Sequence, residues 1–206
     1  MFLQIPEVIE RRMSQLEERD RLDRLDGTSH AQRLRQIPRD TGRFLAILAA
    51  GAPPGAWIEI GTSAGYSSMW LALAARERAT SLTTFEILAA KAALATETFS
   101  LTGLSDVVTL VNGDFLDHVD QLGDVGFCFL DAEKDVYDKC YDAVVPKLVP
   151  GGLLVADNAI SHEADLAPVI RKAQLDPRVD AVVVPIGKGE LVCRRTKAAH
   201  DARATI

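Results

Sequence analysis

Residues 56–68, Ala-Trp-Ile-Glu-Ile-Gly-Thr-Ser-Ala-Gly-Tyr-Ser-Ser, predict a short strand that turns on glycine into a helix. The apolar run 57–60 fits the strand, and Gly61 and Gly65 bracket the turn. A mostly apolar segment over 66–78 fits the helix. Glycine lets the backbone approach a ligand closely, and a helix N-terminus offers free N–H groups. By itself, this stretch indicates only a nucleotide-like ligand.

The rest of the chain repeats this alternation of strand and helix. Such alternation predicts an α/β fold: a Rossmann-like, doubly wound sheet of seven mostly parallel strands, with helices on both faces. The last two strands should form an antiparallel hairpin, because a short turn containing Gly187-Lys188-Gly189 joins them. We expect strands at 57–60, 82–86, 107–111, 125–130, 152–156, 179–185 and 190–195, and helices at 66–78, 88–102, 116–122, 137–148 and 164–175.

The segment ahead of the sheet is expected to be helical. Apolar residues at helical spacing predict an amphipathic helix over 6–25 and a short helical piece over 31–35. A further helix, capped by Asp40 or Thr41, should end at Gly51. We therefore expect one domain over 1–206, with N-terminal helices at 1–50, the Rossmann-like core at 56–195 and a frayed tail at 196–206.

Composition narrows the class of protein. A chain of 206 residues, 48% of them hydrophobic, is long enough for a sizeable core. A net charge of −6 argues against a nucleic-acid partner. No signal peptide and no apolar run of membrane-spanning length is visible, so we expect a cytoplasmic protein without membrane association. Cys128, Cys140 and Cys193 lack metal-ligand spacing and are expected to be buried, reduced thiols.

Polar residues and glycines follow the predicted strands, where ligands bind in open parallel sheets. Glu86 ends the second strand, where an acid can accept hydrogen bonds from ribose hydroxyls; the alternative is a solvated acid ahead of a helix. Gly113 and Asp114 follow the third strand. The spacing of Gly61 and Gly65 is not the G-x-G-x-x-G of dinucleotide-binding proteins. This spacing favours a cofactor with ribose and adenine but no pyrophosphate.

The fourth and fifth strands end in oxygen-bearing side chains. Asp131, Asp157 and Asn158 are hard ligands that suit Mg²⁺ or another hard divalent cation. Because such residues also cap helices well, their spacing alone leaves both interpretations open. Lys134 is either a general base beside the metal or a solvated surface charge. His162 lies close enough to this rim to be a candidate for substrate contact.

Three segments carry a resemblance to a known family: 59–67 (EIGTSAGYS), 129–137 (FLDAEKDVY) and 148–158 (LVPGGLLVADN), with a weaker match at Gln36-Ile37-Pro38. The chain resembles class I S-adenosylmethionine-dependent O-methyltransferases. More narrowly, it resembles the metal-dependent group that contains catechol and caffeoyl-CoA O-methyltransferases and their small bacterial relatives. The resemblance covers about residues 33–195.

The resemblance implies a role for each matching residue. Glu59, Gly61 and Ser67 would hold the amino-acid part of S-adenosylmethionine, Glu86 would bind its ribose, and Asp114 and Phe115 would lie at its adenine. Gly113 would also belong to the cofactor site. Asp131, Asp157 and Asn158 would bind the metal, with Asp131 also beside the cofactor; Lys134 would be the base, and Ile37 and His162 would contact substrate.

Three departures from the family pattern concern the ligand pockets. Phe115 stands where relatives usually have a small residue, which should narrow the adenine pocket. The short connection over 159–164 and the tight turn over 187–189 should leave the acceptor site more open. The identity of the acceptor therefore does not transfer from the family.

The expected reaction is methyl transfer to one hydroxyl of a catechol-like or other vicinal-dihydroxy small molecule. A nicotinamide-dependent oxidoreductase would need the missing G-x-G-x-x-G, and a non-catalytic S-adenosylmethionine-binding protein would not need Lys134 and a metal set. Acidic composition disfavours nucleic-acid methylation. Members of this group often form homodimers, so helix 6–25 could supply an interface or pack on its own sheet.

Overall fold

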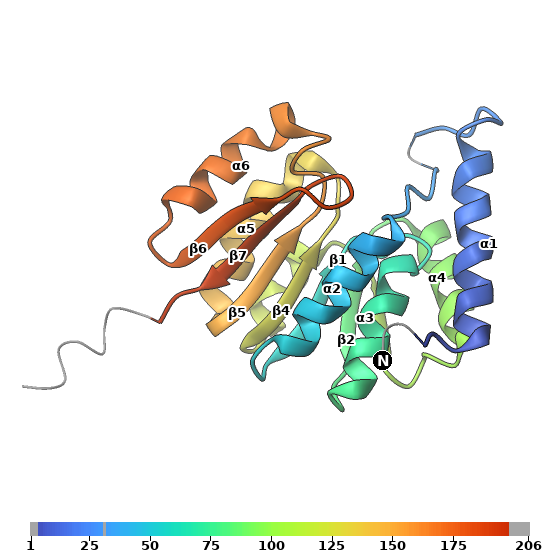
Figure 1. Cartoon of the computed structure of the whole chain (residues 1–206), viewed down its shortest axis with the longest axis horizontal. Helices are drawn as coiled ribbons and strands as arrows, with labels where there is room; N and C mark the ends of the chain where they lie inside the picture. The colour runs from blue at the N-terminus through green and yellow to red at the C-terminus, as the bar shows by residue number, and fades with distance from the viewer. Residues whose placement is uncertain (1–3, 31, 198–206) are drawn as a thin grey trace, which may run out of the picture.

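The computed structural model describes residues 4–30 and 32–197 (Figure 1). Its helices are α1 (Glu7–Asp23), α2 (Arg39–Gly51), α3 (Tyr66–Glu77), α4 (Ala89–Thr102), α5 (Tyr137–Val144) and α6 (Glu163–Leu175). Its strands are β1 (Ala56–Ile60), β2 (Leu82–Glu86), β3 (Val108–Asn112), β4 (Val125–Leu130), β5 (Leu148–Ala156), β6 (Val179–Val184) and β7 (Glu190–Arg195). Short 3₁₀ segments lie at Phe115–Gln121, Lys134–Val136 and Val145–Lys147.

The strands form one seven-stranded sheet in the order β3-β2-β1-β4-β5-β7-β6. Strands β1 to β5 are parallel, whereas β7 runs antiparallel to β5 and pairs with β6 as a hairpin. The predicted fold class and the terminal hairpin are therefore confirmed. Successive strands are added on one side of β1 up to β3 and on its other side from β4. This reversal is the topological switch point at which such sheets bind ligands.

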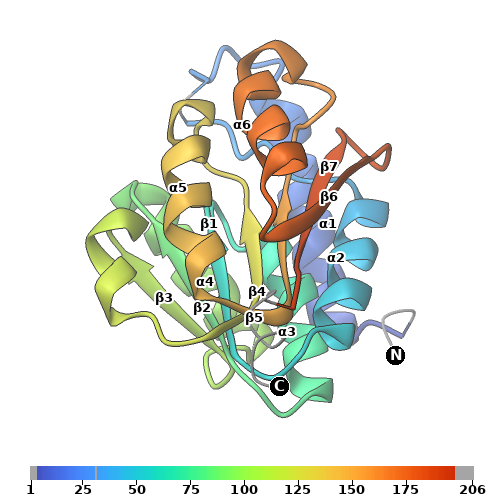
Figure 2. The same cartoon turned by 90° about the vertical axis from the view of Figure 1, so that its left-hand side faces the viewer.

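Each face of the sheet has its own hydrophobic core, because side chains alternate along every strand. Trp57, Phe127 and Phe129 pack with residues of α1 to α4, whereas Ile58 and Cys128 pack with residues of α5 and α6. Figure 2 shows α5 and α6 on the opposite side of the sheet from α2. The central strands are therefore buried on both faces, as expected for a parallel sheet.

Three predicted boundaries in the core and N-terminal region are wrong. Helix α2 begins at Arg39 with Pro38 as its N-cap, whereas the predicted caps Asp40 and Thr41 lie two and three residues later, inside the first turn. Helix α5 ends at Val144 and is followed by a 3₁₀ turn, Val145–Lys147, that contains Pro146. Strand β5 then begins at Leu148 rather than Gly152.

The predicted helical piece at 31–35 is not helical over residues 33–35, and Ala31 lies outside the described residues. Arg35 adopts a left-handed conformation with φ 55°. Carboxylates of α1 fix this backbone: Asp20 accepts from the Arg35 N–H at 2.9 Å and Asp23 from the Leu34 N–H at 3.3 Å. We call residues 33–37 the roof loop, because they cover the cavity described below.

Two further expectations concern the cysteines and the tail. Cys128, Cys140 and Cys193 are buried and free, as predicted. Of the tail, residues 196–197 lack regular structure, and 198–206 lie outside the described residues. Within the described ranges, no helix combines the length and apolar character needed to cross a membrane.

We expect a single methyl group at Gly42 to destabilise the packing of α2 against α3. A Cβ there would lie 2.3 Å from Nε1 of the buried Trp70 ring, whereas a Cβ at Gly51 in the same helix would meet nothing within 4 Å. Overpacking of this kind costs about 1–3 kcal/mol, and glycine-to-alanine in a helix otherwise gains up to about 1 kcal/mol. Gly42→Ala should therefore lower the free energy of unfolding measured in urea, and Gly51→Ala should leave it unchanged or raise it. Equal effects of the two substitutions would contradict this packing.

Candidate functional site

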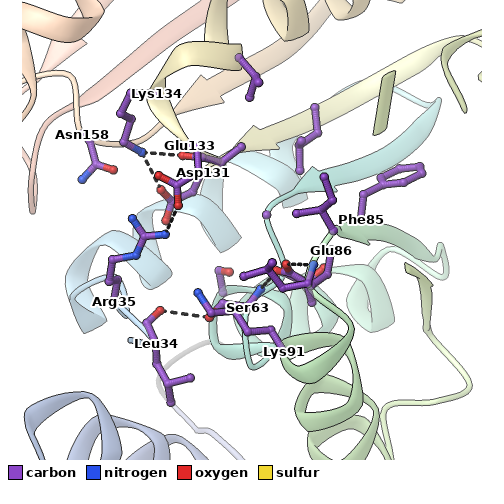
Figure 3. Close-up of a pocket in the computed structure, with 18 of the residues that line it drawn as sticks. Leu34, Arg35, Ser63, Phe85, Glu86, Lys91, Asp131, Glu133, Lys134 and Asn158 are labelled. Atoms are coloured by element: carbon purple, nitrogen blue, oxygen red, sulfur yellow. Dashed lines mark hydrogen bonds and ion pairs between the residues drawn. The ribbon is translucent and has the colours of Figure 1, made fainter. Parts of the chain in front are cut away.

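A cavity of about 720 Å³ opens at the carboxyl ends of the parallel strands, across the switch point between β1 and β4. Its volume is within the range typical of small-molecule sites. Figure 3 shows Phe85, Glu86 and Ser63 on one side, Asp131, Lys134 and Asn158 on the other, and Leu34 and Arg35 of the roof loop beside both. Most of the site residues predicted from the sequence line this cavity: Ile37, Gly61, Ser67, Glu86, Gly113, Asp114, Phe115, Asp131, Lys134, Asn158 and His162.

The turn after β1 passes in direct contact with the end of β4. Gly61 has φ 104°, and a Cβ at this position would lie 2.1 Å from the carbonyl oxygen of Asp131. Ser63, two residues further on, also adopts a positive φ of 49°, which is uncommon for a residue with a side chain. Strained backbone of this kind concentrates at functional sites.

Glu86 is held by backbone donors at the edge of this turn. Its Oε2 accepts from the Ser63 N–H at 2.7 Å, and its Oε1 accepts from the Leu88 N–H at 2.8 Å. A carboxylate has about four acceptor positions, so each oxygen can accept one more hydrogen bond. Glu86 therefore presents a fixed pair of acceptors to the cavity.

An aromatic wall continues from Glu86. Phe115 is buried and meets Phe85 edge-on, with ring centroids 5.3 Å apart and planes at 77°. Asp114 accepts from the Leu116 N–H at 2.9 Å and so starts the 3₁₀ segment that carries Phe115. Phe85, Gly113, Asp114 and Phe115 all line the cavity beside the Glu86 carboxylate, and we call this part of it the aromatic slot.

Glu59 does not line the cavity, unlike the other residues expected to hold the amino-acid part of the cofactor. It is fully buried beneath the turn, where its Oε2 accepts from the hydroxyls of Ser68 and Thr84 and its Oε1 has no hydrogen-bond partner. Because side chains alternate between the two faces of the sheet, the Glu59 side chain points to the face covered by α3, where Ser68 lies, and not into the cavity. Burial raises the pKa of Glu59 to about 7.

Lys134 is held in place by three acceptors. Its Nζ donates to Asp131 Oδ1 at 3.2 Å, to the Ala132 carbonyl at 2.9 Å and to the Tyr137 hydroxyl at 2.7 Å. The Tyr137 hydroxyl in turn donates toward the Leu130 and Asp157 carbonyls at 3.3 and 3.2 Å. Burial raises the pKa of Tyr137 well above its ordinary value, so this hydroxyl stays neutral. The network fixes the amine at the ends of β4 and β5.

Asp157 and Asn158 follow β5, but only Asn158 lines the cavity. Asn158 has φ 72°, and its side-chain amide nitrogen donates to the Ser161 hydroxyl at 3.2 Å. Its backbone carbonyl accepts from the His162 N–H at 2.9 Å, so the side-chain Oδ1 is the oxygen that could bind a ligand. Asp157 is fully buried; its Oδ1 accepts from the Asn158 N–H at 2.6 Å, and its Oδ2 has no partner. Among the described residues, no three His, Cys, Asp or Glu side chains form a metal-binding group.

Several cavity residues escape prediction from the sequence. Arg35 pairs with Glu133, and Ser63 donates to the Leu34 carbonyl at 3.0 Å, so the roof loop contacts both sides of the cavity. Lys91 of α4 lines the same side as Glu86. No local pattern marks these residues, because long-range contacts bring them to the site. Tyr137 falls within a motif that the sequence does display, at 129–137.

Fold and site together define a Rossmann-like protein of the methyltransferase type. Residues 15–196 match the O-methyltransferase family, and the chain belongs to that family. The predicted membership of the class I S-adenosylmethionine-dependent O-methyltransferases is thereby confirmed, against the nicotinamide-dependent alternative.

Similar proteins agree with this assignment. The chain is 34% identical over 129 residues to the catechol O-methyltransferase of Niastella koreensis, covering 60% of this chain and 58% of that protein. It is 27% identical over 193 residues to caffeoyl-CoA O-methyltransferase 2 of Populus trichocarpa, covering 82% and 78%. The SAH-bound methyltransferase PaMTH1 of Podospora anserina has the same fold, with a TM-score of 0.78, 20% identity and coverage of 94% and 89%.

Glu59 should make stability fall as the pH rises. A carboxyl whose pKa is raised from 4.5 to about 7 in the fold contributes stability that is complete below pH 4.5 and is lost as the pH rises to about 7. Between pH 5 and 8 this loss is about 2 kcal/mol. Glu59→Gln keeps an acceptor for Ser68 and Thr84 and should remove that part of the pH response in urea unfolding. The exposed Glu77→Gln should respond like the wild type; an unchanged pH response in Glu59→Gln would refute the assignment.

Proposed function

We propose that this protein transfers the methyl group of S-adenosylmethionine to one hydroxyl of a catechol-like or other vicinal-dihydroxy small molecule, with the assistance of a divalent cation. The observation that carries the proposal is the division of one cavity into two sides. One side has a fixed carboxylate beside an aromatic slot, and the other has Asp131, Lys134 and Asn158. The first side suits an adenosine and the second a hydroxylated acceptor.

On the donor side, the acceptors of Glu86 would take hydrogen bonds from the ribose hydroxyls. The aromatic slot at Phe115 would hold the adenine, because an adenine ring can pack against an aromatic side chain face to face or edge to face. Gly61 and Ser67 would admit the amino-acid part, and Glu59 would support the turn from beneath. Bound S-adenosylmethionine supplies a methyl group activated by its sulfonium. PaMTH1, which shares the fold, binds the product form SAH.

On the acceptor side, the available donors fit a hard divalent cation such as Mg²⁺. Asp131 and Asn158 offer oxygens on the cavity wall. Asp157 directly precedes Asn158 in the chain, and its buried Oδ2 has no hydrogen-bond partner among the described residues. Carboxylate and amide oxygens are ligands that Mg²⁺ accepts, with the rest of the shell left to water or substrate. A cation held there would make an acceptor hydroxyl more acidic and would fix its orientation.

Lys134 would act as the general base. Its amine is already oriented by Asp131 and Tyr137, so a neutral amine could keep these contacts and aim a lone pair at the acceptor. Lys134 would take the hydroxyl proton as the oxygen–methyl bond forms and the carbon–sulfur bond breaks, with the electron pair leaving on sulfur. Roof-loop residue Ile37 and His162 line the cavity and would contact the acceptor.

Removal of the cation should abolish methylation while leaving donor binding in place. We expect EDTA to suppress turnover of a dihydroxybenzoate-type acceptor by about 100-fold or more and added Mg²⁺ to restore it, because the cation contributes several kcal/mol to the transition state. Asp157→Asn should show a similar loss, and the exposed Asp120→Asn should not. Methyl transfer is followed with radiolabelled donor and SAH binding by calorimetry. Full activity in EDTA would exclude metal assistance.

Replacing Lys134 should separate chemistry from binding. Lys134→Met keeps the length of the side chain but removes the amine, so kcat should fall by about 100- to 10,000-fold. Affinity for SAH should change by less than about threefold, since SAH binding is attributed to other residues. Lys139→Met, an exposed lysine on α5, is the matched control and should keep wild-type kcat. A Lys134→Met enzyme with more than half of the wild-type kcat would overturn the base assignment.

A further inference from the structure

Lys91 is the only buried lysine among the described residues, with 8% of its surface exposed. It lies in the first turn of α4 and lines the cavity, and Figure 3 shows it on the same side as Glu86. Its amine has no hydrogen-bond or ion-pair partner in the part of the chain that the structure describes. Buried charges in proteins ordinarily have a partner. The cavity is therefore where a partner for Lys91 can be supplied.

The position of this lysine is unfavourable for folding. Burial lowers the pKa of the Lys91 amine, because the charged form loses its hydration, and the like charge of Arg35 lowers it further. The carboxylates of Glu86, Glu133 and Asp131 oppose this change only in part. The first turn of a helix also carries the positive end of the helix dipole, which disfavours a cation. These costs point to a ligand, and not to the fold, as the reason for an amine at this position.

The two carboxylates with the largest effect on this amine already have partners. Glu86 accepts from two backbone N–H groups, and its remaining acceptor positions are those assigned above to the ribose hydroxyls. Glu133 forms an ion pair with Arg35, so these two charges compensate each other. Lys91 is left as an uncompensated positive charge on the donor side of the cavity.

The surroundings of Lys91 indicate which part of the donor it would meet. Arg35 has the largest electrostatic effect on Lys91 of any charged neighbour, so the amine lies toward the roof loop. Leu34 of this loop is bonded to Ser63, in the turn proposed to admit the amino-acid part of S-adenosylmethionine. Adenine and ribose carry no charge, and the α-carboxylate is the only anionic group of this donor. The chemistry of an unpaired ammonium therefore matches the α-carboxylate.

We propose that Lys91 binds the α-carboxylate of S-adenosylmethionine and thereby selects a donor with an intact amino-acid part. The inference rests on the proposed use of this donor, and it is independent of the divalent cation and of Lys134. A carboxylate beside the amine would compensate its charge, and hydrogen bonds between charged groups are stronger than those between neutral groups. Glu86 and Lys91 would then recognise two different parts of one ligand, a neutral diol and an anion.

The test compares two ligands by calorimetry on the full chain: SAH, which has the amino-acid part, and methylthioadenosine, which keeps adenine, ribose and sulfur but lacks it. Lys91→Met should bind SAH about 10- to 100-fold more weakly and methylthioadenosine within about threefold of wild type, because only SAH loses a charged hydrogen bond. Lys91→Gln, which keeps an N–H donor without the charge, should show the same selective loss. The control Lys139→Met removes an exposed lysine and should change neither affinity. Without ligand, the thermal midpoint of Lys91→Met should equal or exceed that of wild type, since an unpaired buried charge is removed.

The outcomes separate this inference from the proposed function. Equal losses of affinity for both ligands, or a midpoint below wild type in both Lys91 variants, would assign Lys91 to the ribose or to the fold and would overturn the inference. Unchanged SAH affinity would also overturn it; a KM raised for a dihydroxybenzoate but not for catechol would then place Lys91 at an acceptor carboxylate. Wild type that binds no SAH would overturn both proposals, whereas methylation that needs no cation would overturn only the metal assistance.

Discussion

The site depends on one close approach between two backbone segments. The turn after β1 reaches the carbonyl of Asp131 so closely at Gly61 that no side chain fits between them. This contact joins the strand that leads to the donor side of the cavity to the strand that leads to the acceptor side. Because the sheet reverses its winding between these strands, two ligands can meet at this point. A substitution at Gly61 would move one side of the cavity away from the other.

A second link ties the acceptor side together. The buried Tyr137 hydroxyl reaches carbonyls at the ends of both β4 and β5 while accepting from Lys134. The amine is therefore positioned by the sheet rather than by a flexible loop. Arg35, Ser63 and Asn158 adopt left-handed backbone conformations around the same cavity. The fold maintains this strain through long-range hydrogen bonds, which is consistent with selection for a preorganised site.

Features that depend on local sequence could be predicted, whereas features that depend on contacts between segments far apart in the chain could not. Strand ends such as Glu86 and Asp131 could be predicted, because each follows a buried run and parallel strands deliver their ends to one rim. The position of Glu59 could not, since its neighbours in β1 do not show which face α3 would cover. The conformation of the roof loop depends on carboxylates in α1, which bind its backbone N–H groups. Local sequence patterns do not encode this pairing.

The roof loop has no regular secondary structure, yet its backbone is bonded on both sides. Carboxylates of α1 hold the N–H groups of Leu34 and Arg35, and Ser63 holds the Leu34 carbonyl. The conformational entropy of these residues is therefore given up when the chain folds and not when ligands arrive. Ordering a loop on binding weakens affinity, so a covering segment that is ordered beforehand lets contacts with a small acceptor contribute more fully to its binding. Helix α1 lies outside the cavity, yet by ordering the roof loop in advance it reduces the conformational entropy that is lost when a ligand binds.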